Sequence, residues 1–282
     1  MITGIDHIAL SATDIDRATG IVAGWGYKPV FINKKLANDP IKGSYLRTKN
    51  LFHDISYCRP ALNGIPIELT VHGNRYAAEG NDGCYKAVFS GTNPGCDYGQ
   101  APERNSHNCD IITEAFGSFA KSISLKEFNA AAYHINEKSD EKNRYAFVKA
   151  ILSESPNLDD SVDFWFNFGF SLRKADPAGG ENWRLLEFKS HLSPEGFCLL
   201  VIRTDHIRQE TYCVDDAGFN CLAFLTSNIS ADRKRVEANG IEISEDFSFC
   251  AGSNPLRICL CRGPNGEPVE LIEVGRGRNN EK

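Results

Sequence analysis

Two stretches of the sequence match closely: NGIPIEL at residues 63–69 and NGEPVEL at residues 265–271. In each stretch, a turn that contains glycine leads into a short apolar run that begins near a proline. Proline is tolerated at the start of a strand, where a missing amide donor does least harm. Each stretch therefore predicts a turn and then a strand that carries one glutamate, Glu68 or Glu270, among apolar neighbours.

The residues before each stretch repeat one order of elements. Residues 5–10, IDHIAL, alternate as a strand does, and the polar residues after them can cap a helix. A helical pattern follows until the glycines at residues 24–27 stop it. The predicted returning strands of this first unit are residues 28–31, residues 45–47 with 52–58, and residues 65–71. Because the C-terminal region repeats the order, we predict βαβββ modules at residues 4–72 and 214–274.

The remaining sequence contains weaker copies of the same unit. A third βαβββ module is readable at residues 145–203, and the region between it and the first module is a degenerate second copy. The sequence thus predicts two halves. Residues 1–140 hold the clear first module and the degenerate one, and residues 141–282 hold the third and the last.

Composition excludes several classes of function. The chain has 282 residues, of which 41% are hydrophobic and 24% charged, as in ordinary globular proteins of about two domains. A net charge of −6 argues against binding to nucleic acid or to an anionic membrane. We find no secretory signal and no apolar run of about 18 residues, so we expect a cytoplasmic protein with free cysteines.

These residues resemble the vicinal-oxygen-chelate superfamily, which includes glyoxalases, epimerases, ring-cleaving dioxygenases and drug-resistance proteins. The matching pieces are the strand DHIAL at residues 6–10, the capped helix that ends at residues 24–27, and the two strands that carry Glu68 and Glu270. The resemblance implies an α+β fold in which pairs of βαβββ modules curl into cupped mixed sheets. It covers the first and last modules well and the third module in part.

The resemblance also implies a divalent metal ion, held in the cup by side chains from the first and last strands of paired modules. Carried over by position, the ligands are His7 and Glu68 from the first module, and Cys221 and Glu270 from the last. A second histidine or a glutamine is commoner where this chain has Cys221. Asn220 lies one register away and would face the cup instead if the strand slipped by one residue.

The third module lacks such residues, because Ala150 and Leu200 occupy the corresponding places. We therefore expect it to be purely structural. A single metal site then requires the first and last modules to share one cup. In that arrangement His7 and Glu270 should lie within about 10 Å of each other, since metal–ligand bonds of about 2.0–2.2 Å bring ligand atoms close together.

The ligand types indicate the chemistry. One imidazole and two carboxylates suit Zn, Ni, Mn, Co or Fe, whereas calcium takes more oxygen ligands. Such an ion polarises a carbonyl or hydroxyl oxygen and acidifies the neighbouring C–H bond, and Glu68 or Glu270 could carry the proton. We therefore predict a metal-dependent isomerase, epimerase or lyase that acts on a small molecule. Arg47, His53 and Tyr57, on the predicted middle strands, are candidate substrate contacts.

Two other functions stay open. A ring-cleaving dioxygenase prefers two histidines and one carboxylate around iron, and the matched positions supply one histidine. A metal-free protein that binds or sequesters a small molecule would need only the cup, and Cys221, Ala150 and Leu200 favour it. A homodimer is also left open.

Overall fold

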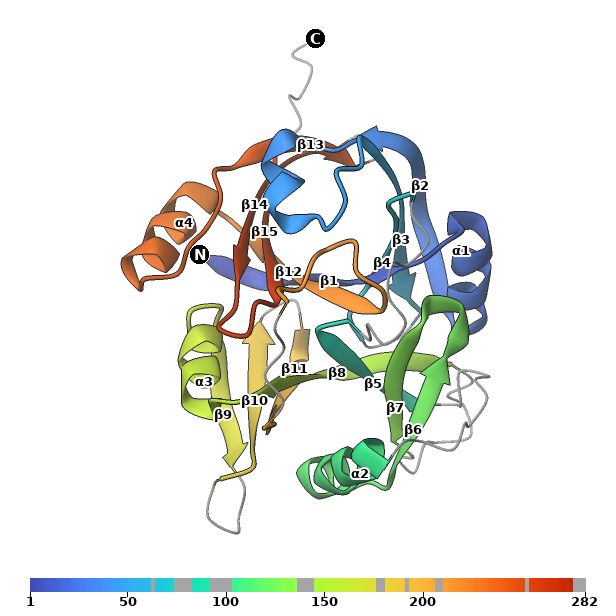
Figure 1. The fold of residues 1–282 in the computed structure, drawn as a ribbon, viewed down its shortest axis with the longest axis vertical. Coiled ribbons are helices and arrows are strands. Elements are labelled where there is room, and N and C mark those ends of the chain that lie inside the picture. The colour runs from blue at the N-terminus through green and yellow to red at the C-terminus, as the bar shows by residue number, and fades with distance from the viewer. Residues whose placement is uncertain are drawn as a thin grey trace.

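The strands form one continuous sheet that curls into two cups, which open in opposite directions (Figure 1). The computed structural model describes residues 1–61, 64–73, 83–91, 103–135, 145–175, 181–190, 193–205, 210–251 and 254–275. The two cups meet where β12 pairs with β5 through Phe219 and Tyr85. Nine cysteines lie in the described part of the chain, and all of them are free.

The first cup has the strand order β2-β3-β4-β1-β12-β15-β14-β13. Its strands are β1 (Ile2–Ser11), β2 (Tyr27–Ala37), β3 (Phe52–Pro60), β4 (Ile67–Val71), β12 (Phe219–Thr226), β13 (Phe247–Ala251), β14 (Asn254–Arg262) and β15 (Pro268–Val274). Helices α1 (Ile15–Gly24) and α4 (Ile229–Ala238) pack on its outer face. The first and last modules therefore share this cup.

The second cup has the strand order β6-β7-β5-β8-β11-β10-β9. Its strands are β5 (Tyr85–Gly91), β6 (Ala120–Leu125), β7 (Ala130–Ile135), β8 (Ala146–Ser155), β9 (Phe170–Ala175), β10 (Trp183–Ser190) and β11 (Ser193–Arg203). Its helices are α2 (Glu103–Phe116), the short 3₁₀ helix η2 (Lys126–Phe128) and α3 (Leu158–Phe166). Each cup thus takes one module from each half of the chain, and the predicted boundary at residues 140 and 141 lies outside the described residues.

The helices begin where the sequence offers a side chain that can cap them. Asp14 accepts hydrogen bonds from the amides of Asp16 and Arg17 at the start of α1. Asn157 and Asn228 cap α3 and α4 in the same way. These caps satisfy amide groups that the first turn of a helix leaves without partners. The capping residues therefore start the helix at the equivalent position, just after the first strand, in three modules.

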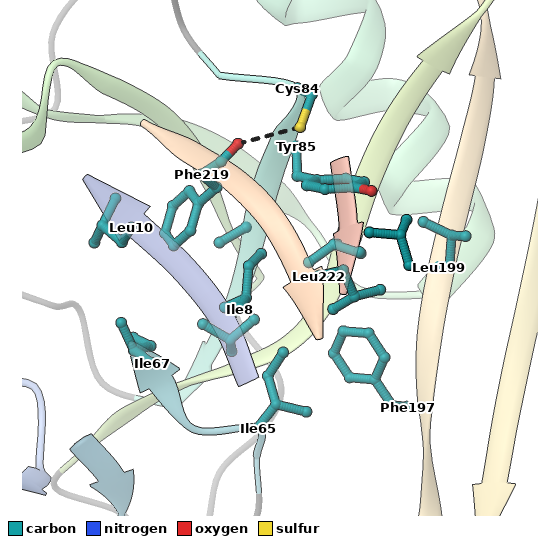
Figure 2. Packing of buried hydrophobic residues seen from close by; sticks show 14 of the residues in the cluster. Ile8, Leu10, Ile65, Ile67, Cys84, Tyr85, Phe197, Leu199, Phe219 and Leu222 are labelled. Atoms are coloured by element: carbon teal, nitrogen blue, oxygen red, sulfur yellow. Dashed lines mark hydrogen bonds between the residues drawn. The ribbon is translucent and has the colours of Figure 1, made fainter. Parts of the chain in front are cut away.

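Alternation along the central strands separates the two faces of the sheet. Ile8 and Leu10 of β1 point into the large apolar core between the cups, where they meet Ile67 and Leu222 (Figure 2). Their neighbours His7 and Ala9 consequently face the hollow of the first cup. The core between the cups thus fixes which residues of β1, β4, β12 and β15 can reach the site.

The hollow of the second cup is filled by a helix. Ile111, Ile112 and Ala115 of α2 pack in one buried apolar cluster with Ala150 and Leu200. Trp183, Leu185 and Ile202 complete this cluster from the wall of the cup. The third module therefore supplies packing surface where the first module supplies polar side chains.

Several predicted strand positions are wrong. Residues 45–47 are not a strand, because the 3₁₀ helix η1 (Pro40–Tyr45) occupies this region and β2 runs further than expected, to Ala37. In the last module, Ile243 makes only an isolated bridge to Cys261, and the strand that follows α4 is β13. Asn63 of the first matching stretch lies outside the described residues.

We expect Ile112→Ala to lower the free energy of unfolding by about 2–5 kcal/mol, because it leaves a cavity where α2 fills the second cup. Ile112 is fully buried. Urea denaturation measures the change. Leu172→Ala, at a half-exposed position of β9, is the control and should change stability by less than about 0.5 kcal/mol. Equal effects of the two substitutions would show that α2 does not support the cup.

Candidate metal centre in the first cup

Three side chains from three strands converge in the hollow of the first cup. The Nε2 atom of His7 on β1 lies 3.6 Å from Oε1 of Glu68 on β4 and 3.7 Å from Oε2 of Glu270 on β15. His7 and Glu270 are thus far closer than the 10 Å that a shared metal site allows. Glu68 and Glu270 belong to the two matching stretches of the sequence.

The strand registers explain this convergence. Ala9 lies beside Glu68, Ala223 lies beside Glu270, and His7 pairs with Ala223 across the antiparallel β1–β12 contact. All these residues face the same hollow, because residues that lie side by side on neighbouring strands, and every second residue along a strand, point to the same face of a sheet. The two alanines have small side chains and leave room above the sheet for the imidazole and the carboxylates.

A bulge in β1 adds a fourth polar side chain. The register of β1 against β12 shifts between Ile5 and His7, so Asp6 is the extra residue. Bulges redirect side chains, and Asp6 consequently lines the same cavity as its neighbour His7. Its Oδ2 lies 2.7 Å from His7 Nδ1, and the hydroxyl of Tyr57 donates to the Asp6 carbonyl at 3.2 Å. Asp6 thus holds the imidazole ring from behind.

The site needs a positive charge. When Nδ1–H of His7 donates its hydrogen bond to Asp6, the buried Nε2 atom faces two carboxylates and has no hydrogen-bond partner among the described residues. Burial opposes the charged imidazole, but Glu68, Asp6 and Glu270 outweigh it and raise the pKa of His7 to about 9. Either a proton on Nε2 or a cation between Nε2 and the carboxylates can supply that charge. The donor set of one imidazole and two carboxylates therefore suits a divalent transition metal by its chemistry. The ligand atoms of these three residues do not all lie within 4.8 Å of one another, so the two glutamates must move closer together to share one ion.

Cys221 takes the place of His7 in the last module. It pairs with Ala9 just as His7 pairs with Ala223, so the two residues are related by the pseudo-symmetry of the cup. Burial, and next the charge of Glu270, raise the pKa of the Cys221 thiol well above its usual range. A thiol is a poor metal ligand until it loses its proton. Cys221 is therefore placed at the fourth corner but keeps its proton there.

The cavity above these residues has a volume of about 170 Å³. Its floor carries Asp6, His7, Glu68 and Glu270, and its walls are mostly apolar. The remaining lining residues are Val30, Phe31, Lys42, His53, Ile55, Tyr57, Arg59, Phe249, Asn254, Leu256, Ile258, Ile272 and Val274. Polar ligands at the bottom and apolar walls above are typical of sites that bind small molecules.

A smaller cavity of about 30 Å³ continues behind this floor and reaches Cys221 and Asn220. The rings of His53 and His72 stack at its edge with centroids 5.3 Å apart. The Nδ1 atoms of both rings and Oδ1 of Asn220 are buried, and no described residue forms a hydrogen bond with them. Burial, and next the charge of Lys42, lower the pKa of His53 and of His72 to about 3, so both rings stay neutral.

The three predicted substrate contacts have different positions. His53 and Tyr57 on β3 line the cavity, but Arg47 does not. The Arg47 guanidinium donates to both carboxylate oxygens of Asp216, at 2.5 and 2.9 Å, and to Glu210 at 2.9 Å. These bonds tie the end of η1 to the loop before β12, so the structure gives Arg47 an anchoring position.

A second group of potential metal ligands lies under Arg47. Ligand atoms of Cys213, Asp215 and Asp216 all lie within 4.8 Å of one another. The Asp216 carboxylate accepts from Arg47, and the Asp215 carboxylate accepts from the amides of Arg47 and Thr48. One carboxylate of this group is thus already paired with a guanidinium and the other is held by two backbone amides, and the group serves as a clamp.

Among the residues that sequence reasoning missed are Asp6 and Lys42 of the larger cavity and His72 of the smaller one. His72 could have been found, because it lies four residues after Glu68, and every second residue of a strand points to the same face. Asp6 could not, since alternation turns it away from His7 unless the bulge is known. No sequence pattern pointed to Lys42, because it reaches the cup from η1, which has no counterpart in the βαβββ repeat.

Known structures share this fold. Glyoxalase I from Zea mays matches with a TM-score of 0.59 at 12% identity, over 95% of this chain and 92% of that one. A "putative dioxygenase" from Bacillus subtilis matches with a TM-score of 0.60 at 12% identity, over 100% and 88% of the two chains. No protein-family model and no curated protein sequence matches the chain. Identities this low establish similarity of fold only.

The architecture defines the class: an α+β protein in which βαβββ modules pair into cups. The chain has the fold of the vicinal-oxygen-chelate superfamily, as its resemblance to that superfamily predicts. Within the described residues, no helix is both long enough and apolar enough to cross a membrane.

The neutral histidine pair predicts how stability depends on pH. The folded pKa of His53 and His72 lies near 3 and the unfolded value near 6.5, so the unfolded chain binds more protons between these values. Stability should therefore fall as pH drops from 7 to 5, by up to about 1.4 kcal/mol per unit for each ring. His7 opposes this slope in the upper part of the range, because its folded pKa of about 9 keeps it protonated while the unfolded chain still gains its proton near pH 6.5. Below about pH 5.5 it is protonated in both states and adds little slope.

We expect His72→Phe to reduce this loss, because it removes one buried group that the unfolded chain protonates. Urea denaturation at pH 7 and pH 5, with chelator present to exclude metal effects, measures it. His107→Phe is the control, since His107 is exposed, and should keep the slope of the wild type. An unchanged slope in His72→Phe would contradict the neutral state of the pair.

Proposed function

We propose that this chain is a metal-dependent enzyme that acts on a small molecule in the first cup. The observation that carries the proposal is the approach of His7 Nε2 to within 3.6 and 3.7 Å of two carboxylates, at the floor of a cavity open to ligands. In this proposal His7, Glu68 and Glu270 hold a divalent ion. Cys221 contributes only if the ion displaces its proton.

The ion would supply polarisation of a carbonyl or hydroxyl oxygen on the substrate, which acidifies the neighbouring C–H bond. The Asp6 carboxylate accepts a hydrogen bond from Nδ1–H of His7 and so keeps the Nε2 lone pair directed at the carboxylates. Such partners of a ligating histidine fix its tautomer and ring orientation. Tyr57 holds Asp6 in turn through its hydroxyl. The apolar walls limit the access of water to the reacting carbon.

Proton transfer falls to the glutamates. Burial raises the pKa of Glu270, which makes its carboxylate a stronger base than an exposed glutamate. We assign Glu270, once it is released from the ion, the removal of the C–H proton, with Glu68 as the alternative carrier. Return of the proton to the neighbouring carbon would complete an isomerisation, and return to the opposite face would complete an epimerisation. Loss of a leaving group from the neighbouring carbon would instead complete a lyase reaction.

A metal-free binding protein is the second candidate, and one observation favours it. The pKa of His7 is raised to about 9, so an imidazolium could balance the two glutamates without a metal ion. A ring-cleaving dioxygenase ranks lower, because the floor of the cup offers one histidine where that chemistry prefers two. The proposed enzyme is cytoplasmic, and its partner is its substrate.

Metal content tests the proposal. Protein purified without chelator should hold close to one transition-metal ion per chain, and Glu270→Gln should hold far less, because glutamine keeps the shape of glutamate but loses its charge. Mass spectrometry of the metal measures both. Glu273→Gln is the control on the same strand, since Glu273 pairs with Arg257 and does not line the cavity.

Chelator should lower the melting temperature of the wild type and leave that of Glu270→Gln unchanged, because a ligand that binds only the folded state stabilises it. A wild type that melts identically with and without chelator, and a Glu270→Gln variant at least as stable, would favour the metal-free protein.

We further expect Asp6→Asn to weaken metal affinity by about 10–100-fold while the fold stays intact, because the amide holds the imidazole less firmly than the carboxylate does. Competition with a fluorescent chelator measures the affinity. Asp16→Asn, an exposed residue paired with Lys34, should leave it unchanged. If Asp6→Asn binds metal as the wild type does, Asp6 has no role in orienting His7.

A further inference from the structure

The charged side chains that line the cavity of the first cup are sorted by sign. Among the described residues, its three carboxylates, on Asp6, Glu68 and Glu270, all lie within 4 Å of a ring nitrogen of His7. Its two permanent cations, Lys42 and Arg59, line the same cavity. No described carboxylate forms an ion pair with either cation, although Arg59 lies over the ring of Tyr57. The cavity therefore presents an acidic floor and two cations available to a ligand.

Lys42 is held in place over the cup. It lies on η1, which crosses the mouth of the cup in Figure 1. The Tyr45 hydroxyl donates to the carbonyl of Leu260 at 2.7 Å and fixes the end of η1. The ammonium group of Lys42 lies 5.5 and 5.3 Å from the ring centroids of Phe247 and Phe249. These contacts position the cation against the aromatic wall of the cavity.

Lys42 is the inner of the two cations. It is partly buried, and it also lines the small inner cavity together with Glu68, His53 and Glu270, whereas Arg59 is exposed. The neighbouring His53 and His72 are neutral and add no charge. An ammonium group that forms no ion pair with a described carboxylate, in a partly closed cavity, favours an anionic ligand, because charge-assisted hydrogen bonds are about twice as strong as neutral ones.

The net charge of the cavity further restricts the charge that a ligand can carry. With a divalent ion bound and His7 neutral, the three carboxylates and two cations that line the cavity leave one net positive charge. One negative charge on the ligand brings this net charge to zero, whereas a dianion leaves a net negative charge in a partly closed site. The balance therefore favours a monoanion such as a carboxylate over a phosphate dianion.

We propose that the substrate is a small carboxylate with an oxygen on the adjacent carbon, a 2-hydroxy or 2-oxo acid, and that Lys42 binds its carboxylate. This inference rests on the proposed metal site. Lys42 and the ligand set share one cavity of about 170 Å³, so the charged group and the oxygen-bearing carbon must be close together in the molecule. Phe31, Leu256 and Val274 accommodate its hydrocarbon part, and Arg59 attracts the anion at the entrance.

Calorimetric titration of the Zn²⁺-loaded protein tests the proposal with five probes. Glycolate, lactate and mandelate are 2-hydroxy acids of increasing apolar size, methyl mandelate is the uncharged analogue, and phenyl phosphate is the phosphate analogue. We expect at least one of the acids to bind, and Lys42→Met to weaken it about tenfold or more, as loss of a hydrogen bond to a charged group does. Lys42→Arg should retain most of the affinity.

The controls separate this inference from the proposed function. Lys49→Met removes an exposed lysine from the same segment and should bind the acids as the wild type does. Lys42→Met should change the affinity for methyl mandelate less than twofold. Metal content is measured on every variant, because a chain that holds no metal contradicts the proposed function itself.

With metal bound, three results would overturn the inference. The first is equal binding of the acids by the wild type and Lys42→Met. The second is no binding of any of the three acids at 10 mM, about the weakest affinity the titration can detect. The third is tighter, Lys42-dependent binding of phenyl phosphate, which would identify a phosphate ester as the substrate class.

Discussion

The antiparallel contact between β1 and β12 is the constraint on which the rest of the structure depends. It joins residues 2–11 to residues 219–226, which lie more than 200 positions apart, and so places the first and last modules in one cup. The register of this contact sets His7 opposite Ala223 and thereby beside Glu270. Alternation makes the register strict, because a slip of one residue would turn His7 into the apolar core and Ile8 into the cup.

The two cups share one arrangement of strands but differ in what occupies their hollows. In the second cup, the positions that correspond to the four corners of the first are Lys86, Tyr133, Ala150 and Leu200, as the β5–β8, β5–β7 and β8–β11 registers place them. Lys86 pairs with Glu154 there, and Asn108 of α2 donates to the Tyr133 hydroxyl. Filling by α2 gives that cup its stability, whereas the first cup retains a polar cavity.

The open cup keeps its shape because polar contacts that do not use the two glutamates of the floor hold the surrounding residues in place. Arg47 binds Asp216, so the segment that carries Lys42 is fixed without using a carboxylate of the floor. Asp6 binds His7 from behind, so the two glutamates stay directed at Nε2. Three carboxylates around one buried imidazole repel one another, and a cation between them is the simplest source of compensation.

The sequence by itself determined the modules, their helix caps, and the three side chains His7, Glu68 and Glu270, because these depend on alternation and on a repeat that can be read along the chain. It could not determine that α2 fills the second cup, that a bulge turns Asp6 inward, or that Arg47 leaves the cavity while Lys42 enters it. Each of these depends on contacts between residues far apart in sequence, and on irregular backbone that follows no period. Local patterns fix which face of a strand a residue takes, but only the packed chain fixes what lies opposite that face.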